Sequence, residues 1–82
     1  MTREELNNAT LEYAREDIGY AKQDGMIAIA QTLKGLINLE VVNGFYQVKN
    51  NRNELLTGIM NEEQMVVWLS KVYDVSEVIV NN

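Results

Sequence analysis

Three carboxylates near the N-terminus, those of Glu5, Glu12 and Glu16, fall on one face of an expected helix. Glu12 and Glu16 lie one turn apart, a rise of roughly 6 Å, which is comparable with the spacing of successive phosphates along a nucleic acid strand. This stripe predicts a surface that imitates a nucleic acid to a basic groove. The more common explanation of such a charge run is a solvated helix face, whose charge Arg15 and Lys22 reduce. As a divalent-metal site, the pair lacks an evident third ligand.

Asp17 is the second polar feature, because it lies between Tyr13 and Tyr20 at helical spacing, on the edge of the side expected to be buried. A carboxylate beside two phenols has the groups that a proton-handling site requires. An Asp in such a position more often accepts a hydrogen bond from a tyrosine or faces water. We therefore favour a structural role for Asp17.

The composition narrows the chemistry further. The chain of 82 residues has no His and no Cys, which removes the usual neutral-pH proton shuttle, thiolate chemistry and the usual zinc ligands. Ser70 and Ser76 are the only serines, and neither lies in a nucleophile elbow. We expect no catalytic, cofactor or metal site, and a carboxylate-dependent enzyme is a weaker interpretation.

The charge balance favours a protein partner. Twelve acidic and seven basic residues give a formal net charge of −5, which repels nucleic acid phosphates and anionic lipid and favours a basic partner. No apolar run approaches the roughly 20 residues of a membrane span, and the first residues do not resemble a signal peptide. We expect a cytoplasmic protein with no membrane contact and no direct nucleic acid binding.

The elements that position these residues begin with a helix, within a single domain over residues 1–82. Thr2 and Glu5 have the spacing of a capping box, and good helix formers continue to Asp24. An apolar stripe at helical spacing marks the buried side. The stripe consists of Leu11, Ala14, Ile18 and Ala21. Gly25 then predicts a helix end or a kink.

The segment Met26–Val41 has the strongest helical pattern in the chain. Apolar residues cover one side, and Gln31, Lys34 and Asn38 fall on the other. Asn43-Gly44 predicts the turn that ends this helix. The first two helices then form an antiparallel hairpin joined at Gly25, or alternatively one continuous kinked helix.

After Gly44 the pattern favours strands. Residues 45–49 and 55–59 flank a polar turn and predict a β-hairpin, and residues 62–73 follow as a third helix behind Asn61. The β-branched run 75–80 predicts a short final strand. The expected fold is therefore α+β: a helical hairpin, a β-hairpin, a third helix and a final strand.

Residues 63–76 loosely resemble the first half of a helix-turn-helix, with a helix, a turn and a Val-Ser pair. The resemblance implies a recognition helix after the turn. Asp74, however, occupies the turn in place of the usual Gly, and residues 77–82 are short, β-branched and free of basic side chains. Since a recognition helix must reach bases and phosphates, a DNA-binding regulator is a weak interpretation.

Several apolar residues fall off the expected buried faces. Ile27 and Leu39 lie off the apolar side of the second expected helix, and Val67 lies on the polar side of the third, beside Trp68. Single exposed apolar residues are ordinary. Several on a small domain without disulfide or metal predict a surface for a partner protein or for a homodimer.

These observations favour a small acidic, non-enzymatic protein-binding module. In size and charge it is similar to inhibitors that phages and mobile elements direct at host defence enzymes, such as CRISPR nucleases and restriction enzymes. The alternative is a self-associating structural or assembly subunit. The residues expected to bind the partner are Glu5, Glu12, Glu16, Ile27, Val67 and Trp68.

Overall fold

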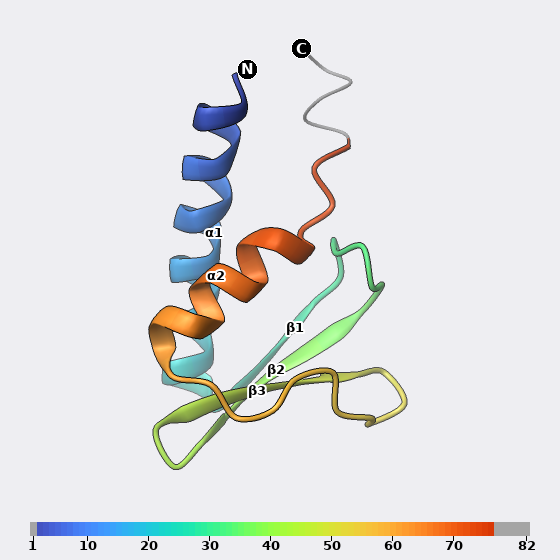
Figure 1. Ribbon diagram of the computed structural model, residues 1–82. Helices are drawn as coiled ribbons and strands as arrows, with labels where there is room; N and C mark the ends of the chain where they lie inside the picture. The colour runs from blue at the N-terminus through green and yellow to red at the C-terminus, as the bar shows by residue number, and fades with distance from the viewer. Residues whose placement is uncertain (1, 77–82) are drawn as a thin grey trace.

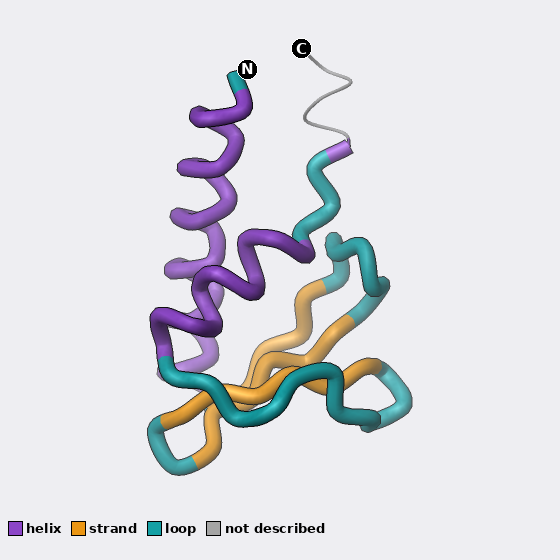
Figure 2. Tube along the Cα trace, viewed as in Figure 1, coloured by secondary structure: helices purple, strands orange, loops and turns teal. Residues whose placement is uncertain are grey.

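The computed structural model describes residues 2–76, which form two helices and a three-stranded antiparallel sheet. The elements follow the chain as α1 (Arg3–Asp24), β1 (Met26–Ile29), β2 (Ile37–Val42), β3 (Phe45–Asn50) and α2 (Glu62–Val72). The strands lie in the order β1-β2-β3. The helices lie on one side of this sheet, with α1 against α2, β1 and β2, and with α2 against β3 (Figures 1 and 2). The predicted α+β class is confirmed, whereas the predicted arrangement within it is not.

The first helix begins and ends where its sequence predicts. The hydroxyl of Thr2 accepts a hydrogen bond from the Glu5 N–H at 3.1 Å, which satisfies one of the free amides of the first turn. Gly25 ends α1 with a φ of 87°, a conformation that glycine adopts without steric cost, and its N–H donates to the Ala21 carbonyl. Ala14, Ile18 and Ala21 of the predicted stripe are buried.

The predicted helix over Met26–Val41 is wrong, because this segment forms β1, a turn and β2. Its apolar residues also alternate with a period of two around the turn, as a strand with one buried face requires. Ile27 pairs with Leu39 across the two strands. Gly35, with a φ of 76°, lies in the turn between them. A glycine there would also have weakened a helix by about 1 kcal/mol relative to alanine.

Asn43-Gly44 connects two strands instead of ending a helix. Val42 pairs with Phe45 directly across the two-residue loop. Both loop residues have positive φ, 52° for Asn43 and 81° for Gly44, as a type I′ hairpin turn requires. The backbone twist of this turn type matches the right-handed twist of the flanking strands, so the hairpin forms between β2 and β3.

The predicted hairpin of residues 45–49 with 55–59 is only partly correct. Residues 45–49 do form a strand, but the main pairing partner of this strand is not residues 55–59. β3 pairs along its whole length with β2. Residues 54–60 return along the other edge of β3 through isolated bridges, Lys49 with Leu55 and Tyr46 with Met60. This return covers the outer edge of β3.

The predicted third helix is confirmed and is α2. A complete capping box starts it, since Asn61 accepts from the Gln64 N–H and the Gln64 side chain accepts from the Asn61 N–H. Of the final strand predicted over 75–80, Val75 and Ser76 lie outside any strand. The remainder of that prediction lies outside the described residues.

The core lies between the helices and the sheet, with Tyr46, Ile37 and Leu39 among the largest fully buried side chains. Leu39 of β2 lies between Ile27 of β1 and Val48 of β3 in the register of the sheet. The predicted exposure of Leu39 is therefore wrong, because the helical interpretation placed it on the wrong side of its element. The buried hydrophobic residues are Ala14, Ile18, Ala21, Ile29, Ile37, Leu39, Tyr46, Val48, Met65, Val66, Leu69 and Val72.

Candidate functional site

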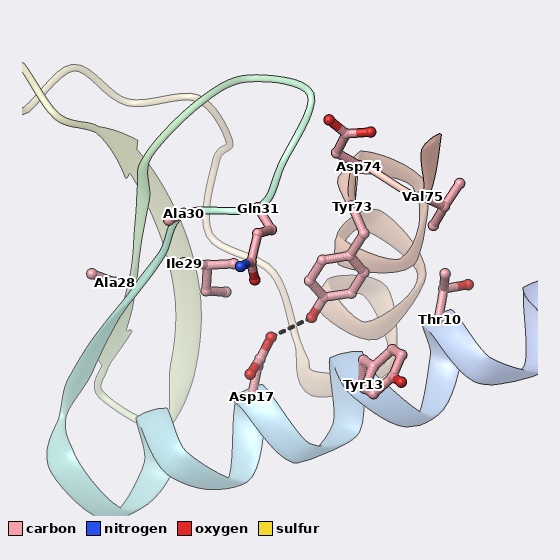
Figure 3. A pocket seen from close by; sticks show the side chains of 10 residues that line it. All are labelled: Thr10, Tyr13, Asp17, Ala28, Ile29, Ala30, Gln31, Tyr73, Asp74 and Val75. Atoms are coloured by element: carbon pink, nitrogen blue, oxygen red, sulfur yellow. Dashed lines mark hydrogen bonds between the residues drawn. The ribbon is translucent and has the colours of Figure 1, made fainter. Parts of the chain in front are cut away.

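A cleft of about 490 Å³ opens between α1, the strand β1 and the chain that follows α2 (Figure 3). Asp17 projects into it from α1, and Tyr73 reaches it from the end of α2. The cleft brings together three segments that are far apart in the sequence. Its lining residues are Thr10, Tyr13, Asp17, Ala28, Ile29, Ala30, Gln31, Tyr73, Asp74 and Val75.

Within the part of the chain that the structure describes, the wall formed by β1 is a free strand edge, because β1 pairs only with β2. The Val41 N–H donates to the Gly25 carbonyl, so the hydrogen-bonded pairs of the ladder continue at Ile27 and Ile29 in the observed register. The N–H and C=O groups of Met26 and Ala28 therefore point away from β2. Within residues 2–76 these outward groups take part in no hydrogen bond outside the strand ladder. An exposed edge of this kind is a template for another strand.

The free edge is short and is closed at one end. Beyond β1 the chain pairs with the residues after α2 through the bridge of Thr32 with Tyr73. The Asp74 N–H donates to the Gln31 carbonyl at 3.0 Å. The turn at Gly25 bounds the other end. The opening thus has room for about four added residues, the length of β1.

A hydrogen bond from the Tyr73 hydroxyl to Asp17 Oδ2, 2.5 Å long, crosses the cleft (Figure 3). Burial and the neighbouring Asp17 carboxylate raise the pKa of Tyr73 above its usual value. Tyr73 therefore stays a hydrogen-bond donor at neutral pH. The hydrogen bond from a tyrosine that was expected for Asp17 is present, but its donor is Tyr73, whereas Tyr13 and Tyr20 are each 59% exposed.

The charges on the two flanks of α1 are segregated. Arg15 and Lys22 lie on the flank that faces α2, where they pair with Glu63 at 3.2 Å and Glu62 at 3.1 Å. Hydrogen bonding to Lys22 lowers the pKa of the Glu62 carboxyl. The flank toward β1 instead carries Asp17, and the charged residues that line the cleft are all acidic. The cleft is therefore suited to a cationic or hydrogen-bond-donating group.

The acidic stripe predicted on α1 lies elsewhere. Glu5, Glu12 and Glu16 are exposed on the side of α1 opposite its buried stripe. Within the described part of the chain, none of them forms a salt bridge. Arg15 and Lys22, which were expected to reduce the charge of this stripe, turn toward α2 instead.

The predicted apolar partner residues do not form one surface. Ile27 is half-buried and packs against the core. Val67 is 46% exposed and Trp68 half-buried on α2, where they line a separate shallow depression with Met60. Val67 and Trp68 thus lie together, while Ile27 belongs to β1. Self-association through this side of α2 stays a prediction.

The sequence interpretation missed most of the cleft. Ala28 and Gln31 fell inside the segment interpreted as a helix, so no free strand edge was expected there. The alternation of Ile27, Ala28 and Ile29 was the signal that a strand was present. The approach of Tyr73 to Asp17 joins residues 56 positions apart, and no local pattern marks it.

Comparison with known proteins adds no identification: no family model, curated protein or solved structure matches the chain. Neither helix within residues 2–76 has the length and hydrophobicity that crossing a membrane requires. In the same part of the chain, no group of three or more acidic side chains is placed to hold a metal ion. The free edge of β1 and its acidic cleft together form the candidate functional site.

Proposed function

We propose that this chain is a non-enzymatic protein-binding module that receives an extended segment of a partner protein at the free edge of β1. The observation that carries the proposal is the outward direction of the Met26 and Ala28 backbone groups beside the cleft. Main-chain hydrogen bonds to a sheet edge supply affinity, and adjacent pockets for alternate side chains supply specificity. The edge of β3 offers no equivalent opening, because residues 54–60 cover it.

Replacing Ala28 by Pro is expected to lower the affinity for such a segment by about tenfold or more. Proline removes the outward N–H and places its ring at the edge, while Ile27 and Ile29 keep their hydrogen bonds to β2. The matched control is Ala28→Val, which retains the N–H and should bind as the natural chain does. Affinities are measured for binders selected from a displayed library of random eight-residue peptides. Binders that tolerate Ala28→Pro would contradict the proposal.

The acidic stripe of α1 supports a second candidate function, inhibition of a nucleic-acid-binding protein of the phage or mobile-element type. Glu12→Gln combined with Glu16→Gln keeps the shape of the helix and removes two charges. If these carboxylates pair with Arg or Lys in a desolvated groove of the partner protein, the double variant should bind that partner more weakly by about 1–3 kcal/mol. The affinity of the natural chain for the partner should also fall steeply with added salt. Titration of the double variant at low and high salt measures both effects. An unchanged affinity with a flat salt response would exclude this function.

A further inference from the structure

A strand added at β1 would direct alternate side chains into the cleft. Successive side chains of a strand point to opposite faces of the sheet. On the face that carries Ile27 and Ile29, the added side chains would lie beside α1, next to Asp17 and Tyr13. On the other face they would lie beside Met26 and Ala28, which are exposed. The residues on the α1 side of the cleft are therefore the ones that can discriminate between the side chains of different bound segments.

The Asp17 carboxylate is held in place by one hydrogen bond and can accept further hydrogen bonds. Its Oδ2 accepts from the Tyr73 hydroxyl, and an ionised carboxylate has about four acceptor positions on its two oxygens. The hydrogen bond fixes the rotamer of Asp17 before any ligand binds. A fixed, half-buried carboxylate binds a cation with less loss of side-chain freedom than a mobile surface carboxylate does.

Tyr13 lies one helical turn before Asp17 and lines the same cleft (Figure 3). Its ring is 59% exposed, so a ligand can reach it. A guanidinium stacks on an aromatic ring and donates two parallel hydrogen bonds to a carboxylate, whereas an ammonium is a compact, strongly hydrated charge. The pair of Tyr13 and Asp17 therefore suits arginine better than lysine.

We propose that the segment received at β1 carries an arginine on its α1 side and that Asp17 selects it. This inference rests on the proposed function, because the same edge receives the segment. A second copy of this chain fits the edge poorly. Each copy has a net charge of −5, and pairing two β1 edges would bring together the carboxylates of Asp17 and Asp74 that line each cleft.

The test uses capped eight-residue peptides that alternate Thr and Val and carry one central Arg, Lys, citrulline or Glu. Citrulline keeps the shape of arginine and removes its charge. Amide NMR titrations of the whole chain give the dissociation constants and locate the peptide. The Arg peptide should bind about five- to tenfold more tightly than the citrulline peptide, and the largest shifts should fall at Met26 and Ala28. Lysine should be intermediate and Glu weakest.

Asp17→Asn identifies the selecting residue, because an amide still accepts from the Tyr73 hydroxyl but carries no charge. In this variant the Arg and citrulline peptides should bind with nearly equal dissociation constants, so that the ratio of the two falls close to one. Glu4→Gln, in the first turn of the same helix and away from the cleft, should leave the preference unchanged. If Arg and citrulline bind the natural chain equally and still shift β1, the arginine inference fails and the proposed function stands. If no peptide shifts β1 at millimolar concentration, both fail.

Discussion

Leu39→Ala should lower the free energy of unfolding by about 2–5 kcal/mol. Leu39 is fully buried in the central strand, between Ile27 and Val48 on its two neighbours. Truncating it removes buried apolar area and leaves a cavity that three paired strands cannot readily close. For a domain of this size the loss is a large part of the total stability. Urea unfolding followed by circular dichroism measures it, with Leu39→Val as the milder variant if Leu39→Ala does not fold.

The matched control is Leu33→Ala, the same change in the turn between β1 and β2, where the side chain is 70% exposed. It should alter the stability by no more than about 0.5 kcal/mol. A helix over Met26–Val41 would reverse the two results, because it buries Leu33 and leaves Leu39 on a flank. A larger loss of stability for Leu33→Ala than for Leu39→Ala would therefore contradict the assignment of this segment to the sheet.

The two helices could be predicted because local chemistry determines their ends. Thr2 and Asn61 cap their first turns with their own side chains, and Gly25 ends α1 in a left-handed conformation. Each signal lies within a few residues of the feature that it specifies. A single sequence therefore contains enough information to place them.

The segment between Gly25 and Gly44 was mistaken for a helix because short apolar runs fit two periods. Its residues alternate in β1 and β2 but also recur at spacings of three and four. The choice between them depends on pairing with β3, which is tertiary context. Asn43-Gly44 was the one local signal for a hairpin, since both residues adopt positive φ at low cost.

The cleft could be predicted only in part. Asp17 was recognised as a boundary carboxylate that accepts a hydrogen bond, because its place on α1 follows from helical spacing. Its donor could not be identified, since Tyr73 follows a different helix and reaches α1 only after the sheet has formed. The free edge of β1 depends on the same folding of the chain. The residues on α1 were therefore predictable, and those supplied by β1 and by the chain after α2 were not.

Tyr73→Phe should lower the stability at neutral pH by about 1–3 kcal/mol, because the variant keeps the ring but loses a hydrogen bond to a carboxylate. The difference should shrink as the pH rises. Folding raises the pKa of Tyr73, chiefly through burial, so the unfolded phenol loses its proton first, near its ordinary value of 10.0. The stability that Tyr73 contributes is then present below that pH and is lost above it, by up to about 1.4 kcal/mol per pH unit.

Urea unfolding of the natural chain and of Tyr73→Phe between about pH 7 and about pH 11 measures this difference. Burial also raises the pKa of Tyr46, but Tyr46 is present in both proteins and cancels in the comparison. The matched control is Tyr13→Phe, which removes an exposed hydroxyl and should change the stability by no more than about 0.5 kcal/mol. A larger cost for Tyr13→Phe than for Tyr73→Phe would assign the Asp17 hydrogen bond to Tyr13. That result would contradict the arrangement of side chains described for the cleft, in which Tyr73 holds Asp17 facing β1.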